Sequence, residues 1–269
     1  MSRRGWILFI TMALIWGIPY LLIKVAVDEL SPAALVFSRT ILAALLLAPS
    51  AMLRGQLRPV LARWRWVLAF SVIEICLPWF FLGYAELELS SSLTALLVAA
   101  VPLVAAVLVR VTGHEQLSAR RIAGLVIGFA GVAALAGFDT GPAGSLAVTA
   151  VAGVAICYAL GPLILARYLA DLPGLGVIAA ALVIAAVLYA PAGVAQWPET
   201  APGLDTWLSV GTLAVVCTAI AFVVFFRLVA EVGPARSAVI TYVNPAVACS
   251  SALSCSTRRS PRSPRSASR

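Results

Sequence analysis

The sequence predicts an all-α protein, a polytopic bundle of transmembrane helices, and three observations support this. Of the 269 residues, 62% are hydrophobic and 11% are charged, whereas soluble globular domains carry about 25% charged residues. The apolar residues form long continuous runs, and only helical bundles and closed barrels satisfy their backbone hydrogen bonds in lipid. Short segments that contain most of the charged residues separate the runs, as in chains that cross a bilayer many times.

Nine of these runs are long enough to cross the hydrocarbon core of a bilayer as helices. The first is too long for a secretory signal peptide, and no small-residue cleavage site follows it. A tight turn at residues 28–32 ends it, and a basic loop at residues 54–65 separates the second helix from the third. The predicted helices are residues 6–27, 33–53, 66–84, 89–109, 122–137, 145–165, 174–194, 207–226 and 237–253.

The charges between these helices predict their orientation. The start of the chain and the loops after even-numbered helices carry Arg3, Arg4, Arg54, Arg58, Arg63, Arg65, Arg110, Arg120, Arg121, Arg167, Arg227 and Arg236. Loops after the first, third, fifth and seventh helices contain no Lys or Arg, and hold Asp28, Glu29, Glu86, Glu88, Asp139, Glu199 and Asp205. Because basic loops remain inside, we expect a multi-pass protein of the cytoplasmic (plasma) membrane with a cytoplasmic N-terminus. The lipid bilayer is then its partner, and the net charge of +8 does not indicate nucleic acid.

Uncommon residues recur at an offset of 143 positions, which predicts two structural repeats. Residues 1–138 form the first five-helix repeat, residues 139–253 form a second repeat of four helices, and residues 254–269 are a tail rich in Ser, Arg and Pro. The recurring pairs are Pro19 and Pro162, Lys24 and Arg167, Asp28 and Asp171, Glu88 and Glu231, Thr94 and Ser237, Ala95 and Ala238, and Pro102 and Pro245.

The tail does not fit the charge rule that the loops obey. Nine helices would place the C-terminus outside, yet five arginines occupy the last twelve residues. We therefore expect that a tenth helix is missing, with a frameshift or a truncated gene near Ala248 as one hypothesis. A disordered basic tail is the alternative.

Five stretches resemble the EamA-type branch of the drug/metabolite transporter superfamily. They are ALIWGIPYLLIKVAV (13–27), SPAALVFSRTILAALLL (31–47), SSLTALLVAAVPL (91–103), GHEQLSARRIAGLVIGFAGV (113–132) and ARSAVITYVNPAVA (235–248). The resemblance covers residues 6–248. It implies a carrier of two inverted five-helix repeats that exports small metabolites or toxic compounds from a cavity lined by helices 1–4 and 6–9. This chain differs in lacking the tenth helix.

Three ionisable residues within the apolar runs are candidates for a substrate or proton pathway. Glu74 lies near the middle of the third predicted helix, where a charged carboxylate costs about 2.5–3.5 kcal/mol on insertion scales for Asp. It is either a proton-exchanging group or a structural carboxylate, protonated or paired with Arg39. Arg39 is either a clamp for an anionic substrate or that counter-ion. Lys24, the only lysine, either binds an anionic group or extends its amine to the interface.

Polar, aromatic and proline residues complete the candidate pathway. Asn244 precedes Pro245, and a proline exposes polar backbone at membrane depth; Asn244 and Tyr242 either line the pathway or bridge two helices. Further candidate bends are Pro19, Pro78, Pro102 and Pro162. Aromatic candidates for the cavity wall, which would suit apolar or cationic groups, are Trp16, Tyr20, Trp79, Tyr84 and Tyr158.

The pattern favours a secondary transporter that moves small metabolites or amphipathic compounds by alternating access, with proton coupling through Glu74. No catalytic residues, metal site or cofactor are predicted, because His114 lacks a nucleophile or metal partner and no phosphate-binding loop occurs. Two alternatives stay open, a membrane enzyme acting on lipid-linked substrate and a non-transporting membrane subunit. Gly124 and Gly128 form a small-residue face for packing within the subunit or for a homodimer.

Overall fold

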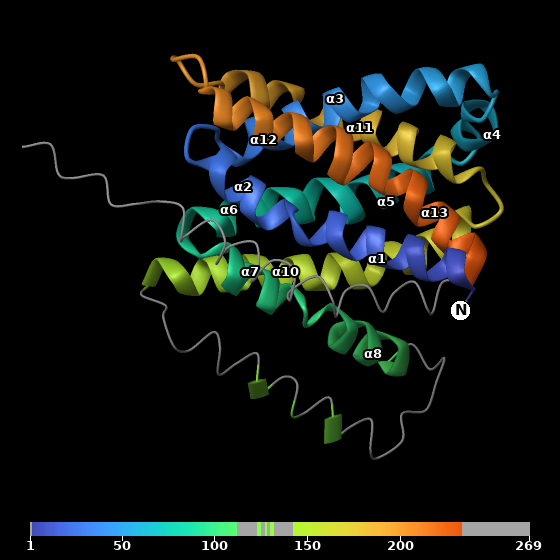
Figure 1. Ribbon diagram of the computed structural model, residues 1–269, viewed down its shortest axis with the longest axis horizontal. Coiled ribbons are helices and arrows are strands. Elements are labelled where there is room, and N and C mark those ends of the chain that lie inside the picture. The colour runs from blue at the N-terminus through green and yellow to red at the C-terminus, as the bar shows by residue number, and fades with distance from the viewer. Residues whose placement is uncertain (1, 112–122, 125–126, 128–129, 132–141, 233–269) are drawn as a thin grey trace, which may run out of the picture.

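The computed structural model describes residues 2–111, 123–124, 127, 130–131 and 142–232. Within these residues the regular elements are helices, and the long ones lie side by side in a bundle (Figure 1). Six of the described helices are long and apolar enough to cross a membrane, at Arg3–Val27, Pro32–Leu53, Trp64–Glu88, Gly144–Leu169, Gly174–Ala195 and Leu204–Leu228. They correspond to the first three and the sixth to eighth predicted helices, which confirms the predicted fold class. The ninth predicted helix and most of the fifth lie outside the described residues.

Several spans consist of consecutive helical segments rather than one continuous helix. The described helical segments of the first half are α1 (Arg3–Gly17), α2 (Pro19–Val27), α3 (Pro32–Leu53), α4 (Leu57–Leu61), α5 (Trp64–Phe70), η1 (Ser71–Cys76), α6 (Leu77–Glu88), α7 (Ser91–Val98) and α8 (Val101–Val111). In the second half they are α10 (Pro142–Ile164), η2 (Leu165–Leu169), α11 (Gly174–Ala195), α12 (Leu204–Ala214), η3 (Val215–Ile220) and α13 (Ala221–Val232).

Prolines lie at or near four of the interruptions. Pro19 begins α2 directly after the end of α1, and Pro102 is the second residue of α8, after the break from α7. A proline supplies no backbone N–H and its ring crowds the preceding turn, so it favours a bend or a break in a helix. Pro78 lies in the first turn of α6, and Pro162 lies inside α10 shortly before η2. Pro245 falls outside the described residues.

Two π-helical segments occupy corresponding places in the two halves. The segment η1 begins at Ser71 in the third predicted helix, and η3 begins at Val215 in the eighth. Their starts are 144 residues apart, one more than the offset of the sequence repeat. A π-helical turn widens the helix and redirects its side chains, and such turns are frequent at functional sites.

The two halves pack against each other in a symmetric pattern. The helix α3 lies along α11, which pairs the second predicted helix with the seventh (Figure 1). The helix α6 packs on α10, which pairs the third with the sixth, while α2 packs on α12 and α1 on α13, which pairs the first with the eighth. If the two halves are exchanged, the pairing of the third helix with the sixth becomes the pairing of the eighth with the first. The pairing of the second helix with the seventh stays the same. A two-fold axis between two repeats would produce this pattern.

Small residues allow the close approach of α3 and α11. Ala179, Ala180 and Ala181 of α11 are buried in the same apolar cluster as Ala43, Ala44 and Ala51 of α3. A Cβ atom built at Gly193 would lie 2.5 Å from the Cβ atom of Phe37 in α3. Without a strong hydrophobic driving force in lipid, such close backbone packing is the main source of helix association.

The structure corrects the expected end of the third helix. The sequence analysis placed Glu86 and Glu88 in a loop, but α6 continues to Glu88 and Glu86 is fully buried. The side chain of Ser90 accepts a hydrogen bond from the backbone of Leu93 and caps α7, so the connection between α6 and α7 is very short. Arg227 likewise lies within α13 rather than in a loop, and the basic loop at 54–65 contains α4.

Candidate functional site

Arg39 lies in the middle of the bundle at the contact between the two halves. Its side chain projects from α3 and is only 6% exposed. The guanidinium carbon lies 3.6 Å from the centre of the Trp79 ring in α6. The Nε atom donates a hydrogen bond of 3.0 Å to Oγ1 of Thr218 in η3. Because Trp79 and Thr218 come from different halves of the chain, Arg39 joins the two halves at this point.

The surroundings of Arg39 leave its charge without an anionic partner. A cation over a desolvated aromatic ring gains about 2 kcal/mol, far less than hydration supplies to an exposed charge. Among the described residues the Nε bond to Thr218 is the only hydrogen bond of the guanidinium, and no carboxylate lies within ion-pair distance. The two terminal nitrogens therefore retain donors for another group.

Glu74 occupies η1 and faces α10. A Cβ atom built at Gly161 would collide with the Glu74 carboxylate, so the carboxyl group lies directly against the backbone of α10. Its Oε2 atom is buried and has no hydrogen-bond partner among the described residues. The one ion pair between described residues is Arg63–Asp171, so Glu74 and Arg39 are not paired with each other. The structure does not support the counter-ion alternative considered from the sequence.

Tyr158 of α10 lies near both of these ionisable groups. Its phenol is close enough to interact electrostatically with Arg39, Glu74 and Tyr20. The ring packs against both of the larger apolar clusters of the bundle. Residues from α3, η1, α6, α10 and η3 thus meet in one central group, which we call the central polar cluster: Arg39, Glu74, Trp79, Tyr158 and Thr218.

Lys24 contacts the end of a helix and lies away from this cluster. Its Nζ atom donates to the backbone oxygen of Glu86 and, at 3.3–3.4 Å, to those of Leu87 and Leu89. The last carbonyls of a helix lack partners within the helix, and a lysine amine can satisfy them. In this structure Lys24 caps α6, and its role as a substrate ligand stays a prediction.

The remaining aromatic candidates are spread over the bundle. Trp16 packs on the rings of Phe222 and Phe225 in α13, with centroids 6.1 and 5.0 Å away. Tyr20 is buried in an apolar cluster to which α2, α6, α7, α10 and α12 all contribute. Tyr84 is partly exposed and makes no ring contact with a described residue. Tyr242 and Asn244 lie outside the described residues.

The profile of the EamA-like transporter family matches residues 3–137 and 145–253. The chain belongs to the EamA-like transporter family. It is 29% identical over 243 residues to proteins named as the uncharacterized inner membrane transporter YedA from Escherichia coli K12 and O157:H7, covering 87% of this chain and 77% of theirs. A crystal structure, described only as that of a protein, shares the fold with a TM-score of 0.69 at 19% identity, covering 97% of this chain and 91% of that chain.

Sequence reasoning missed two polar residues of this EamA-like transporter. Thr218 looked like one more small residue in an apolar run, and only packing shows that it accepts the Arg39 hydrogen bond. Glu86 was assigned to a loop, yet its Oε2 atom accepts a 3.0 Å hydrogen bond from Ser91, and its buried Oε1 atom has no described partner. Lys24 lies near Glu86 only because α2 packs on α6, so no local sequence pattern indicated that Glu86 is buried.

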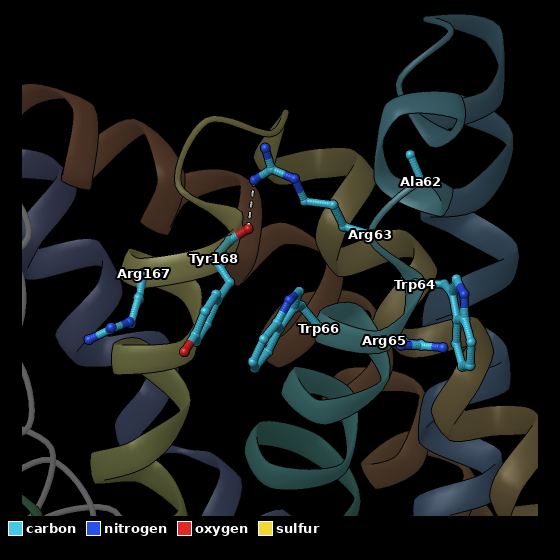
Figure 2. A pocket seen from close by; sticks show the side chains of 7 residues that line it. All are labelled: Ala62, Arg63, Trp64, Arg65, Trp66, Arg167 and Tyr168. Atoms are coloured by element: carbon cyan, nitrogen blue, oxygen red, sulfur yellow. Dashed lines mark hydrogen bonds between the residues drawn. The ribbon is translucent and has the colours of Figure 1, made fainter.

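A pocket of about 570 Å³ lies at one end of the EamA-like bundle, away from the central polar cluster. Figure 2 shows the side chains that line it, which are Ala62, Arg63, Trp64, Arg65, Trp66, Arg167 and Tyr168. At its edge the two Nη atoms of Arg63 contact the two carboxylate oxygens of Asp171 at 2.6 and 2.8 Å. These bonds lower the pKa of Asp171 below its ordinary value, because they stabilise the charged carboxylate.

Proposed function

We propose that this transporter moves small molecules with an anionic group and an apolar part, that it exports them across the cytoplasmic membrane, and that protons drive the exchange. The observation that carries the proposal is the buried Arg39, held between Trp79 and Thr218 with free terminal donors. The N-terminus and the basic loops face the cytoplasm in this proposal, because positive loops stay inside.

Burial of Arg39 supports an anionic substrate group. A buried charge without a partner is costly, and intramembrane ionisable residues normally face a cavity or pair with another group. Bidentate binding of a carboxylate or phosphate would use the two free guanidinium nitrogens and supply the missing charge. The adjoining rings of Trp79 and Tyr158 would contact the apolar part of the same molecule.

Glu74 is the proposed proton carrier. Its carboxyl group is sealed against α10 without a hydrogen-bond partner for Oε2. An isolated negative charge there would be strongly unfavourable, so we propose that Glu74 binds a proton when the bundle is closed around it. When the halves separate, water reaches the carboxyl group and the proton leaves. Tyr158 would couple this change electrostatically to Arg39.

Contacts between the halves at both ends of the bundle support alternating access. At the end of the bundle that holds the arginine-lined pocket, which we call the basic end, Arg63 of the first half binds Asp171 of the second. At the acidic end the backbone N–H of Gly203 donates a 2.6 Å hydrogen bond to Oε2 of Glu29. We propose that these two contacts break in turn as the repeats rock about the central polar cluster, which opens the cluster to one side at a time.

The test is flux in proteoliposomes with and without a pH gradient, using a panel of organic anions, amino acids and amphipathic amines. Gradient-driven flux of an anionic compound is expected for the wild type and for the control Glu88→Gln, which neutralises an exposed carboxylate at the end of α6. Glu74→Gln should abolish the response to the gradient, and Arg39→Gln should abolish flux of the anion. Gradient-driven flux that survives Glu74→Gln would refute the proton role.

A further inference from the structure

The pocket at the basic end of the bundle is a second candidate binding site, separate from the central polar cluster. We infer that it binds the phosphate-bearing headgroup of an anionic phospholipid. Three features of the pocket support this inference: a pair of stacked aromatic rings, two arginines without an acidic partner, and a position at the ends of two membrane spans.

The aromatic pair forms the rigid part of the pocket. The rings of Trp66 and Tyr168 stack with centroids 3.5 Å apart and planes within 5° of parallel. Arg63 fixes this arrangement, because its Nη1 atom donates a 2.7 Å hydrogen bond to the backbone oxygen of Tyr168 (Figure 2). Since Trp66 belongs to α5 and Tyr168 to η2, the pocket is built from both halves of the protein.

Two further arginines of the pocket, Arg65 and Arg167, carry positive charges that no described acidic side chain neutralises. Arg63 is engaged by Asp171, but Arg65 and Arg167 have no ion pair or hydrogen bond with a described residue. Each is exposed and lies beside an aromatic ring, Arg65 at 5.6 Å from Trp64 and Arg167 at 5.7 Å from Tyr168. They flank the stacked pair on opposite sides in Figure 2. Arg63, Arg65 and Arg167 together with Asp171 therefore carry a net charge of +2, which is available to attract an anionic ligand.

The depth of the pocket favours a lipid over a soluble anion. Trp64 is the first residue of one candidate span, and η2 ends at Leu169, the last residue of another. Lipid phosphates lie at this level, just outside the hydrocarbon core. Trp64 and Trp66 are 55% and 39% exposed, as expected for aromatic side chains in the interfacial belt. A headgroup between these rings and guanidiniums would keep its acyl chains along the apolar surface of the bundle.

Native mass spectrometry of the full chain, loaded with phosphatidylglycerol or phosphatidylcholine, tests this inference. The variant Arg65→Gln/Arg167→Gln removes the two unpaired charges and leaves the Arg63–Asp171 pair and the aromatic stack in place. The control Arg54→Gln/Arg58→Gln makes the same change of charge at two exposed arginines outside the pocket. Competition with inorganic phosphate, measured in parallel, distinguishes a lipid from a soluble anion.

We expect one phosphatidylglycerol to remain bound to the wild type and to the control in preference to phosphatidylcholine. The pocket variant should bind it about 30-fold more weakly, from the attraction of two arginines to anionic lipid. Equal losses in both variants would show general surface attraction and overturn the site. Displacement of the lipid by millimolar inorganic phosphate would also overturn the inference, because the ligand would then be a soluble anion.

Discussion

The carboxylate of Glu74 lies against Gly161, at a point where no other residue type leaves room for it. Glu74 comes from a π-helical turn of the first half, and Gly161 precedes Pro162 in α10 of the second half. A Cβ atom built at Gly161 would lie 2.9 Å from Cδ of Glu74 and closer still to Oε2. The glycine is therefore part of the environment that seals the proposed proton carrier.

Gly161→Ala should lower the free energy of unfolding by about 1–3 kcal/mol, the usual cost of forcing an extra methyl group into a packed interior. Thermal unfolding in detergent measures this change. The control Gly211→Ala places a Cβ atom with nothing within 4 Å, so it should be neutral or stabilising. Adding Glu74→Ala removes the colliding atoms and should restore much of the loss. Equal stability of the two single variants would contradict the predicted collision.

Thr218→Val should weaken the position of Arg39. The substitution keeps the shape of the side chain but removes the hydroxyl that accepts the 3.0 Å bond from Nε of Arg39 and donates a 2.8 Å bond to the backbone oxygen of Leu213. A hydrogen bond to a charged group contributes about 1.5–3 kcal/mol, and the free energy of unfolding should fall by that amount. Thr212→Val is the matched control, because Thr212 makes no side-chain hydrogen bond with a described residue. A similar effect of both variants would show that the contact with Arg39 does not stabilise the fold.

Lys24→Met should destabilise the end of α6. Three backbone oxygens lose their donor, and a cation near a helix C-terminus contributes about 0.3–2 kcal/mol, depending on burial. Chemical unfolding measures the loss, and Lys24→Arg should recover part of it. If capping is the only role of Lys24, the substrate KM of folded Lys24→Met protein stays unchanged. A raised KM would instead support the sequence-based prediction that Lys24 binds substrate.

The Arg63–Asp171 pair should make stability depend on pH in the acidic range. The folded-state pKa of Asp171 lies below its ordinary value of 3.8. The pair therefore contributes its full stability above pH 3.8 and loses it as the pH falls through the folded-state pKa. Asp171→Asn should lower the unfolding temperature at neutral pH and have no effect at the acidic limit. Asp28→Asn, at an exposed position without such a pair, is the control. A pH-independent difference between Asp171→Asn and wild type would contradict this assignment.

The composition of the sequence determined the class of this protein, and the positions of its apolar runs predicted the membrane-spanning helices. Apolar runs of membrane length must become helices, because no other open structure satisfies backbone groups in lipid. The described spans accordingly match the predicted ones closely, as in α3 and α11. The end of α6 was missed, since helix limits depend on caps such as Lys24, which lies more than sixty residues away in sequence.

Only the tertiary structure decided which polar groups meet. Arg39 and Thr218 are 179 residues apart, and no local pattern links them. The sequence offered Glu74 as the partner of Arg39, but the packing of α10 directs Glu74 to Gly161 and leaves Arg39 to Trp79 and Thr218. The physical reason is that hydrophobicity acts along the whole length of a helix and is readable locally. Polar contacts instead depend on helix rotation and π-helical turns, which are set when the two halves pack together.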